Sequence, residues 1–171
     1  MFNSFCPDYR VKSIFDISSK WLKRNGYLKV VVDMDNTLLP RDKNLVSPRA
    51  LTWIRQMLQQ RINVALITND NGERVDAIIR QCNVGCIKRA GKPLPFCYKQ
   101  IVKAFGGGKI LFVGDELLTD VWGAKFSNHP VVLVESLGGK EKLWTRVLRK
   151  IEKFIFKRLV ASGKMPKEKV L

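Results

Sequence analysis

Four short, largely apolar runs constrain the fold of this chain more than any other feature of its 171 residues. They lie at about residues 28–32, 62–67, 109–113 and 131–134, and Val, Ile and Leu make up most of each run. β-Branched side chains favour strands, and a run that is apolar on both faces indicates a strand buried on both sides. A fifth, shorter extended piece is expected at Cys86–Ile87.

Segments with the apolar spacing of a helix separate these runs. The clearest start signal is Ser47 followed by Pro48, an N-cap and a proline at the first helical position. Further helices are expected over residues 11–26, 73–81, 95–104, 121–126 and 142–159. Strands that alternate with helices are typical of βαβ units. The sequence therefore predicts an α/β fold with three α/β/α layers around a mostly parallel, five-stranded sheet.

Length and composition predict one domain over residues 1–160 and a flexible polar tail over residues 161–171. The sequence has no run of about 18 apolar residues that would span a membrane. Four cysteines without a framework pattern suggest free thiols in a reducing cytosol. The 31 basic and 15 acidic residues give a net charge of +16, which favours a polyanionic partner, either a nucleic acid or an anionic membrane.

Polar side chains stand where the predicted strands end. Asp33 and Asp35 come at the end of the first strand, Thr68 follows the second, Asp115 follows the run at 109–113, and Lys92 lies between them in the sequence. In a parallel sheet, ligands collect beyond the carboxyl ends of the strands, so we expect these five side chains to meet at one edge. Carboxylates so close together raise one another's pKa unless a cation lies between them, and Mg²⁺ prefers such hard oxygen ligands.

Four short motifs that occur in order carry a family resemblance. They are DMDNT at 33–37, ITN at 67–69, GKP at 91–93 and GDELLTD at 114–120. This set resembles the four motifs of the haloacid dehalogenase (HAD) superfamily of phosphohydrolases. Within that superfamily, residues 7 to 155 resemble the YqeG family, whose relatives in yeast mitochondria and plant plastids are phosphatidylglycerophosphate phosphatases. The resemblance implies a Mg²⁺-dependent phosphatase with that lipid as the substrate.

The resemblance also implies roles for individual residues. Asp33 would be the nucleophile that accepts the phosphoryl group as an aspartyl-phosphate, and Asp35 the general acid and then the base. Mg²⁺ would be held by Asp33, by the backbone carbonyl of Asp35 and by Asp115, with Asp120 contributing through water or from a second layer. Thr68 and Lys92 would bind the phosphoryl oxygens during catalysis. The residues expected to bind substrate are Thr37, Thr68, Asn69 and Lys92.

The spacing between the motifs leaves no room for a cap domain. Thirty residues separate Thr37 from Thr68, and twenty-three separate Thr68 from Lys92, which is enough only for the expected strands and helices. An uncovered site suits a phosphate on a large partner, such as a lipid, a nucleic-acid end or a phosphoprotein.

The C-terminal helix favours the lipid among these. Its apolar side is expected to comprise Leu143, Trp144, Val147, Leu148, Ile151, Phe154 and Ile155, and its basic side Lys142, Arg146, Arg149, Lys150, Lys153 and Lys157. A helix of this kind either packs its apolar stripe on the sheet or lies in an anionic membrane interface. Both hold if its start packs while Phe154, Phe156 and Leu159 touch lipid. The expected location is the cytoplasm, at the inner face of the membrane.

Two other functions stay open at the level of sequence. One is a phosphatase of the same chemistry that acts on nucleotides or nucleic-acid ends, to which the net charge of +16 would also contribute. The other is a binding protein without catalysis, which uses its basic surface to attach to RNA, the ribosome or a membrane. The intact set of Asp33, Asp35, Thr68, Lys92 and Asp115 disfavours the second, because a scaffold would not need all five.

Overall fold

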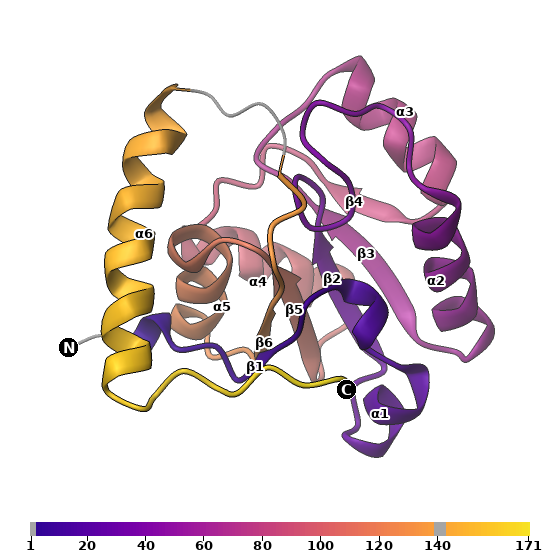
Figure 1. The fold of residues 1–171 in the computed structure, drawn as a ribbon. Helices are drawn as coiled ribbons and strands as arrows, with labels where there is room; N and C mark the ends of the chain where they lie inside the picture. Colours follow the sequence, from indigo (N-terminus) through magenta and orange to yellow (C-terminus); the bar gives the residue numbers. More distant parts are fainter. Residues whose placement is uncertain (1–2, 139–142) are drawn as a thin grey trace.

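Figure 1 shows the computed structural model, which describes residues 3–138 and 143–171. In this part of the chain six strands form one sheet, in the order β1-β6-β5-β2-β3-β4, and all neighbouring strands are parallel. The strands are β1 (Tyr9–Arg10), β2 (Lys29–Asp33), β3 (Asn63–Ile67), β4 (Gly85–Ile87), β5 (Ile110–Gly114) and β6 (Val131–Leu133). The predicted α/β class and parallel sheet are confirmed.

The prediction of five strands was wrong, because β1 adds a sixth at the edge of the sheet. Tyr9 pairs with Val132, and Arg10 pairs with Leu133. Asp8 fixes the start of this pairing, since its carboxylate accepts a hydrogen bond of 2.9 Å from the backbone N–H of Val131. A strand of two residues that includes an arginine has no apolar run by which the sequence could reveal it.

The helices occupy nearly the predicted segments. They are α1 (Ser19–Arg24), α2 (Pro48–Gln59), α3 (Glu73–Cys82), α4 (Pro95–Ala104), α5 (Trp122–Phe126) and α6 (Leu143–Ala161), with short turns η1 (Asn3–Phe5), η2 (Ile14–Asp16) and the π-helical η3 (Leu117–Val121). The predicted cap is confirmed, since the Ser47 hydroxyl accepts from the N–H of Ala50. The single helix predicted over residues 11–26 was wrong: Ser13 and Ser18 each cap a new turn, so η2 and α1 form instead.

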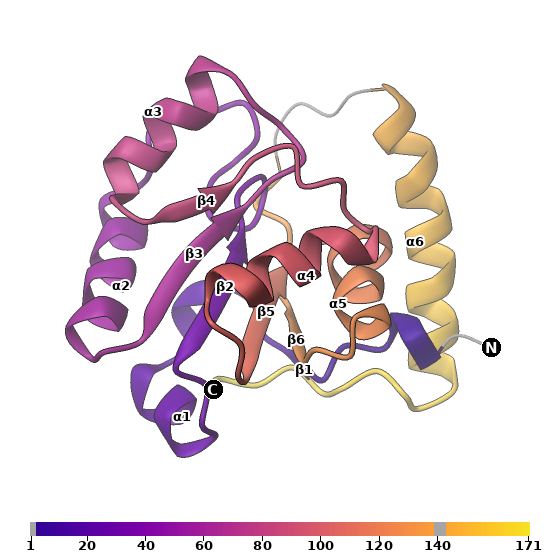
Figure 2. The ribbon, with the colours of Figure 1, turned by 180° about the vertical axis from the view of Figure 1, so that it is seen from behind.

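Helices cover both faces of the sheet, which gives the three predicted layers. Alternate residues of β2 point to opposite sides: Val30 and Val32 pack with α1, α2 and α3, while Val31 packs with α4, α5 and α6. Figure 2 shows α4 and α5 in front of the sheet. Figure 1 shows α2 and α3 on the side of the molecule where β3 and β4 lie. Between β2 and β3 the chain builds only α2, and between β3 and α4 only α3 and β4, so the predicted absence of a cap holds for these described residues.

Helix α6 buries only part of the predicted apolar face. Ile155 and Leu159 are buried in the core, and Phe156 packs against it, whereas Ile151 and Phe154 are 47 % and 52 % exposed. The expected contact of Leu159 with lipid is therefore wrong, and Phe156 is only partly exposed. Hydrophobicity alone misplaces this face because a polar side chain, that of Glu152, also points inward. Part of the predicted helix lies outside the described part of the structure. This applies to Lys142 as a whole and to the side chains of Leu143, Trp144, Arg146 and Val147.

The segment after α6 follows a defined path along the N-terminal part of the chain. The N–H of Lys169 donates to the carbonyl of Arg10 at 3.1 Å, and the N–H of Leu171 donates to Asp16 at 2.7 Å. Leu171 is buried against the same core as α1. The polar composition that led us to expect a flexible tail gives no sign of these contacts.

Candidate active site

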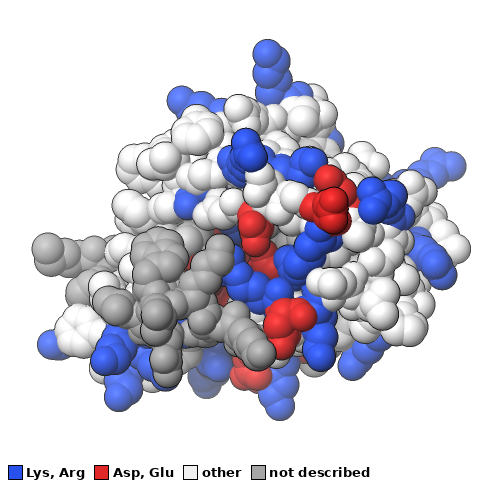
Figure 3. All heavy atoms as spheres, turned by 90° about the horizontal axis from the view of Figure 1, so that it is seen from above, with Lys and Arg blue, Asp and Glu red and all other residues white. Residues whose placement is uncertain are grey.

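The predicted site residues meet at the carboxyl edge of the sheet. Asp33 ends β2 directly beside Ile67 of β3, which places Thr68 next to it, and Asp115 follows the last residue of β5. Figure 3 looks down on this edge, where acidic and basic side chains lie side by side near the centre of the view. A pocket of about 60 Å³ opens there, lined by Asp33, Asp35, Asn36, Arg41, Thr68, Asn69, Asp70, Lys92, Glu116, Thr119 and Asp120.

Lys92 reaches the centre of the site as a buried cation. Its ammonium pairs with Asp33 and, at 2.6 Å, with Asp120. Asn69 holds the backbone of Lys92 in place from both sides: its amide oxygen accepts from the Lys92 N–H at 2.7 Å, and its amide nitrogen donates to the Lys92 carbonyl at 3.0 Å. The Asn69 side chain thus positions the lysine.

The electrostatics of this cluster are dominated by an excess of negative charge. Burial raises the pKa of Asp33 well above its usual value, and Asp120 and Asp115 raise it further against the opposing effect of Lys92. Burial lowers the pKa of Lys92, but Asp120 and Asp33 outweigh it, and the net pKa is raised well above normal. Burial is the main cause of the pKa shift of Asp33, and the raised pKa of Lys92 follows from the carboxylates that face it, an excess of negative charge that a further cation would correct.

Three carboxylates are close enough together to share a metal ion. Ligand atoms of Asp33, Asp115 and Asp120 all lie within 4.8 Å of one another. Asp115 Oδ1 accepts a hydrogen bond from Thr37 at 3.1 Å, while its Oδ2 is buried without a hydrogen-bond partner among the described residues. Burial, with Asp120 and then Glu116, raises the pKa of Asp115 to about 7. A hard divalent cation fits this donor set of carboxylate oxygens.

Gly114 is required for the carboxylate of Asp120 to enter this group. A Cβ atom added to Gly114 would lie 2.3 Å from Asp120 Cγ. Asp120 Oδ2 also accepts from the N–H of Glu116 at 3.1 Å, which closes the loop after β5 around the carboxylate. The direct contact of Asp120 with Lys92 places it in the first layer around the pocket.

Asp35 is held by a hydroxyl and by an arginine. Its Oδ2 accepts from the Thr68 hydroxyl at 3.3 Å, and Arg74 Nη2 lies 2.9 Å from its Oδ1. Arg74 comes from the first turn of α3, and nothing in the sequence singled it out. Thr37, expected to bind substrate, instead donates to Asp115 and does not line the pocket.

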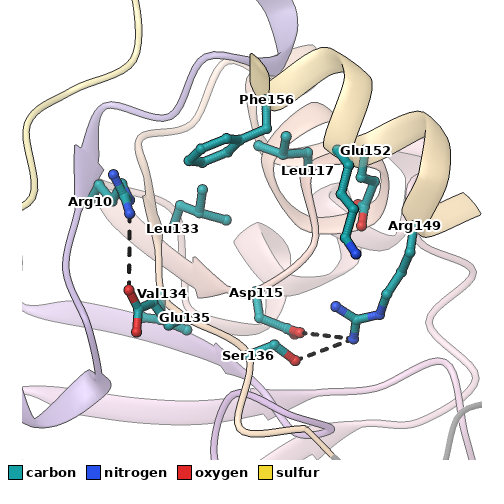
Figure 4. A pocket seen from close by; sticks show the side chains of 11 residues that line it. Arg10, Asp115, Leu117, Leu133, Val134, Glu135, Ser136, Arg149, Glu152 and Phe156 are labelled. Carbon is teal, nitrogen blue, oxygen red and sulfur yellow. Dashed lines mark hydrogen bonds and ion pairs between the residues drawn. The ribbon is translucent and has the colours of Figure 1, made fainter. Parts of the chain in front are cut away.

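Two further residues on α6 reach the metal-binding side of the site. Arg149 Nη2 donates to the Ser136 hydroxyl at 3.2 Å and lies 3.9 Å from Asp115 Oδ2, as Figure 4 shows. Glu152 accepts from the N–H of Leu118 at 2.9 Å, and burial raises its pKa to about 7. Arg149 was expected on the solvent side of the helix, and that expectation was wrong. Both residues border a cavity of about 250 Å³ between α6 and β6.

The fold and the site together define a class of hydrolase. The sheet is parallel, buried acids lie at its carboxyl edge, and Lys92 pairs with the first of these acids, Asp33. The haloacid dehalogenase-like hydrolase family matches residues 40–128, a span that includes Thr68, Lys92 and Asp115 and begins after Asp33 and Asp35. The chain belongs to this family, and its curated relatives are phosphatases.

The more particular likeness is to YqeG. The chain is 30 % identical over 161 residues to "Probable phosphatase YqeG" of Bacillus subtilis strain 168, and the match covers 93 % of this chain and 94 % of that one. It is 25 % identical over 172 residues to "Phosphatidylglycerophosphate phosphatase 1, chloroplastic/mitochondrial" of Arabidopsis thaliana. That match covers 94 % of this chain but 49 % of the plant protein, so the chain spans about half of that relative.

One solved structure supports the fold. The 3-deoxy-D-manno-octulosonate 8-phosphate phosphatase of Yersinia pestis matches with a TM-score of 0.50 at 13 % identity, over 86 % of this chain and 90 % of that one. The cobalt-bound phosphatase YrbI of Haemophilus influenzae gives a TM-score of 0.49 at 16 % identity, over 80 % and 89 %. At this level of identity the likeness concerns the fold alone.

Proposed function

We propose that the chain is a Mg²⁺-dependent phosphatase that works through an aspartyl-phosphate on Asp33, and that its substrate is phosphatidylglycerophosphate. The observation that carries the proposed chemistry is the buried group of Asp33, Lys92 and Asp120 at the floor of the pocket, with Asp35 and Thr68 beside it. A nucleophile, a second acid and a lysine for the phosphoryl oxygens thus border one small space.

In the first step, an Asp33 carboxylate oxygen attacks phosphorus and the bond from phosphorus to the alcohol oxygen breaks. Asp35 gives its proton to that oxygen. In the second step, Asp35 takes a proton from water as the water attacks phosphorus, the bond to Asp33 breaks, and phosphate and free Asp33 result. Thr68 and Lys92 bind the phosphoryl oxygens, whose negative charge is spread out in the transition state.

The bound cation would be held by Asp33, Asp115 and Asp120, together with the backbone carbonyl of Asp35. The buried Oδ2 of Asp115 supports this, because it accepts no hydrogen bond among the described residues and its ion pair with Arg149 is long at 3.9 Å. Mg²⁺ would supply charge neutralisation for the phosphoryl group and for the acids around it. Thr37 then orients Asp115, and Gly114 leaves room for Asp120.

The lipid substrate is supported by the named plant relative and by the outer face of α6. Ile151 and Phe154 are exposed there, and the basic residues around them are exposed as well: Lys150, Lys153, Lys157 and Arg158. Each basic residue near an anionic membrane surface contributes about 1 kcal/mol to attachment. In the described part of the chain, no helix is long and apolar enough to cross a membrane. We therefore propose peripheral attachment at the inner, cytoplasmic face through this helix.

The test is phosphate release from phosphatidylglycerophosphate in anionic vesicles, with Mg²⁺ and with a chelator. A phosphorylated oligonucleotide and a nucleoside monophosphate serve as rival substrates. We expect turnover of the lipid to exceed that of both rivals and to stop when Mg²⁺ is removed. Faster turnover of the oligonucleotide would assign the site to nucleic-acid ends, which the net charge of +16 also favours. A chain inert on all three that binds RNA would contradict the enzymatic proposal.

A further inference from the structure

A wider cleft adjoins the catalytic pocket. Its volume is about 490 Å³, against about 60 Å³ for the pocket around Asp33. The two spaces share six lining residues, Arg41, Asn69, Asp70, Lys92, Glu116 and Thr119, so they adjoin each other. Whatever is attached to a phosphate bound at Asp33 and Lys92 therefore has this cleft as adjoining space.

The part of the cleft away from the catalytic pocket has an apolar wall. Leu118 of η3, Trp122 of α5, Leu148 of α6 and Pro93 form it. All four are partly exposed, unlike the core residues Leu117 and Val121 beside them. Four apolar side chains from three stretches of the chain that leave surface open to the same cleft favour an apolar ligand there.

The geometry of Trp122 favours an aliphatic ligand over a nucleic-acid base. Its ring stacks on Phe5, with 5.8 Å between the centroids and 28° between the planes, and it contacts Phe126 at 6.1 Å. Phe5 thus covers one face of the indole, which reduces the aromatic surface open to a stacked base, whereas an alkyl chain needs only apolar contact. The shared rim carries two carboxylates, Asp70 and Glu116, and two cations, Arg41 and Lys92, so it presents no net positive charge to the phosphate backbone of a polynucleotide.

We propose that this cleft binds the alcohol part of the substrate and selects alcohols that carry an apolar chain. The proposal rests on the proposed function in one respect, which is that the scissile phosphate binds at Asp33 and Lys92. It goes further in assigning the selection of an amphipathic phosphomonoester to Leu118, Trp122 and Leu148.

A series of n-alkyl phosphates tests the cleft directly. Ethyl, butyl, hexyl and octyl phosphate, each below its micelle-forming concentration, are compared by kcat/KM, with adenosine monophosphate as the rival ligand. Full burial of one CH₂ group corresponds to about fourfold in affinity. We expect kcat/KM to rise about two- to fourfold per CH₂ along the series. A flat series, or a preference for the nucleotide over octyl phosphate, would overturn the proposal.

Variants localise the effect to the wall. Leu148→Ser and Trp122→Ala should each reduce the ratio of kcat/KM for octyl phosphate to that for ethyl phosphate by about tenfold. Leu58→Ser is the matched control, because Leu58 is 41 % exposed on α2 and does not line the cleft. Because Trp122 also packs on Phe5, the fold of Trp122→Ala is checked by circular dichroism. If Trp122→Ala is unfolded, the result for Leu148→Ser decides the test.

The outcomes separate this proposal from the proposed function. A steep alkyl series without turnover of phosphatidylglycerophosphate supports the cleft and rejects only the lipid. Turnover of the lipid with a flat alkyl series rejects the cleft. If no phosphate ester is hydrolysed, calorimetry compares the dissociation constants of ethylphosphonate and octylphosphonate. Tighter binding of octylphosphonate would support the apolar cleft, and equal dissociation constants would overturn the proposal.

Discussion

Arg149 Nη2 lies 3.9 Å from Asp115 Oδ2, which ties helix α6 to a carboxylate of the candidate metal site. Glu152, one turn further along α6, accepts from the backbone of Leu118 in the loop that carries Asp120. The C-terminal helix therefore supports the loop after β5 at two points, and a change in α6 is expected to be felt at the metal site.

The first prediction concerns Arg149. Arg149→Gln removes the cation that lies 3.9 Å from Asp115 Oδ2, so the metal-free protein should melt at a lower temperature than wild type. Added Mg²⁺ should raise the melting temperature more in the variant than in wild type, because the ion replaces the missing positive charge. Lys150→Gln is the control, since Lys150 is exposed on the same helix. Equal Mg²⁺ shifts in wild type and both variants would contradict the coupling.

Lys92 should matter far more than a lysine in an exposed ion pair. Lys92→Met leaves Asp33 and Asp120 buried without their partner, so we expect a loss of about 3–5 kcal/mol in the free energy of unfolding, and the loss of activity. Lys88→Met removes an exposed pair with Asp76 at 2.7 Å and should change little. Urea unfolding of both variants in chelator gives the comparison, and similar effects of the two would show that burial is not the deciding factor.

Asp33 should be essential for chemistry and not for folding. Asp33→Asn removes the nucleophile while Lys92 keeps its pair with Asp120, so we expect at least about a thousandfold loss of kcat with a preserved fold. Phosphate release and circular dichroism on the same sample provide the measurement. A variant that folds and retains wild-type turnover would remove the proposed intermediate.

Gly114 should tolerate no side chain. In Gly114→Ala, the added methyl group would displace Asp120 from Lys92, and a displacement of about 1 Å in a catalytic group costs about a hundredfold in rate. Gly85→Ala is a matched control in another strand, because its added Cβ would meet nothing within 4 Å. The kcat of both variants is compared with wild type, and a fully active Gly114→Ala would show that Asp120 is not needed where the structure has it.

Glu152 predicts how stability depends on pH. Burial raises its pKa in the folded state to about 7 from 4.5, so the folded protein holds this proton more tightly than the unfolded chain. The contribution of Glu152 to stability is therefore present below pH 4.5 and is lost as the pH rises to 7. The variant Glu152→Gln should become more stable than wild type by up to about 3 kcal/mol across that range. Urea unfolding at several pH values tests this, and parallel curves for the two proteins would contradict it.

The sequence was sufficient to predict the position of site residues that directly follow the end of a strand. Asp33, Thr68 and Asp115 could be brought together because parallel strands share a carboxyl edge, and Lys92 because its motif accompanies theirs. Arg74 and Arg149 could not, because each reaches the site through a long side chain from a helix whose rotation about its axis the sequence does not specify. For the same reason the buried face of α6 was misassigned around Glu152.

The pairing of β1 with β6 has a consequence for the behaviour of shortened chains. An exposed strand edge recruits strands from other molecules, and β6 would present such an edge without Tyr9 and Arg10 beside it. The backbone of Lys169 in turn bonds to Arg10 on the outer side of β1. We therefore expect a chain that lacks either β1 or the segment around Lys169 to expose a strand edge and to self-associate more readily than the full chain.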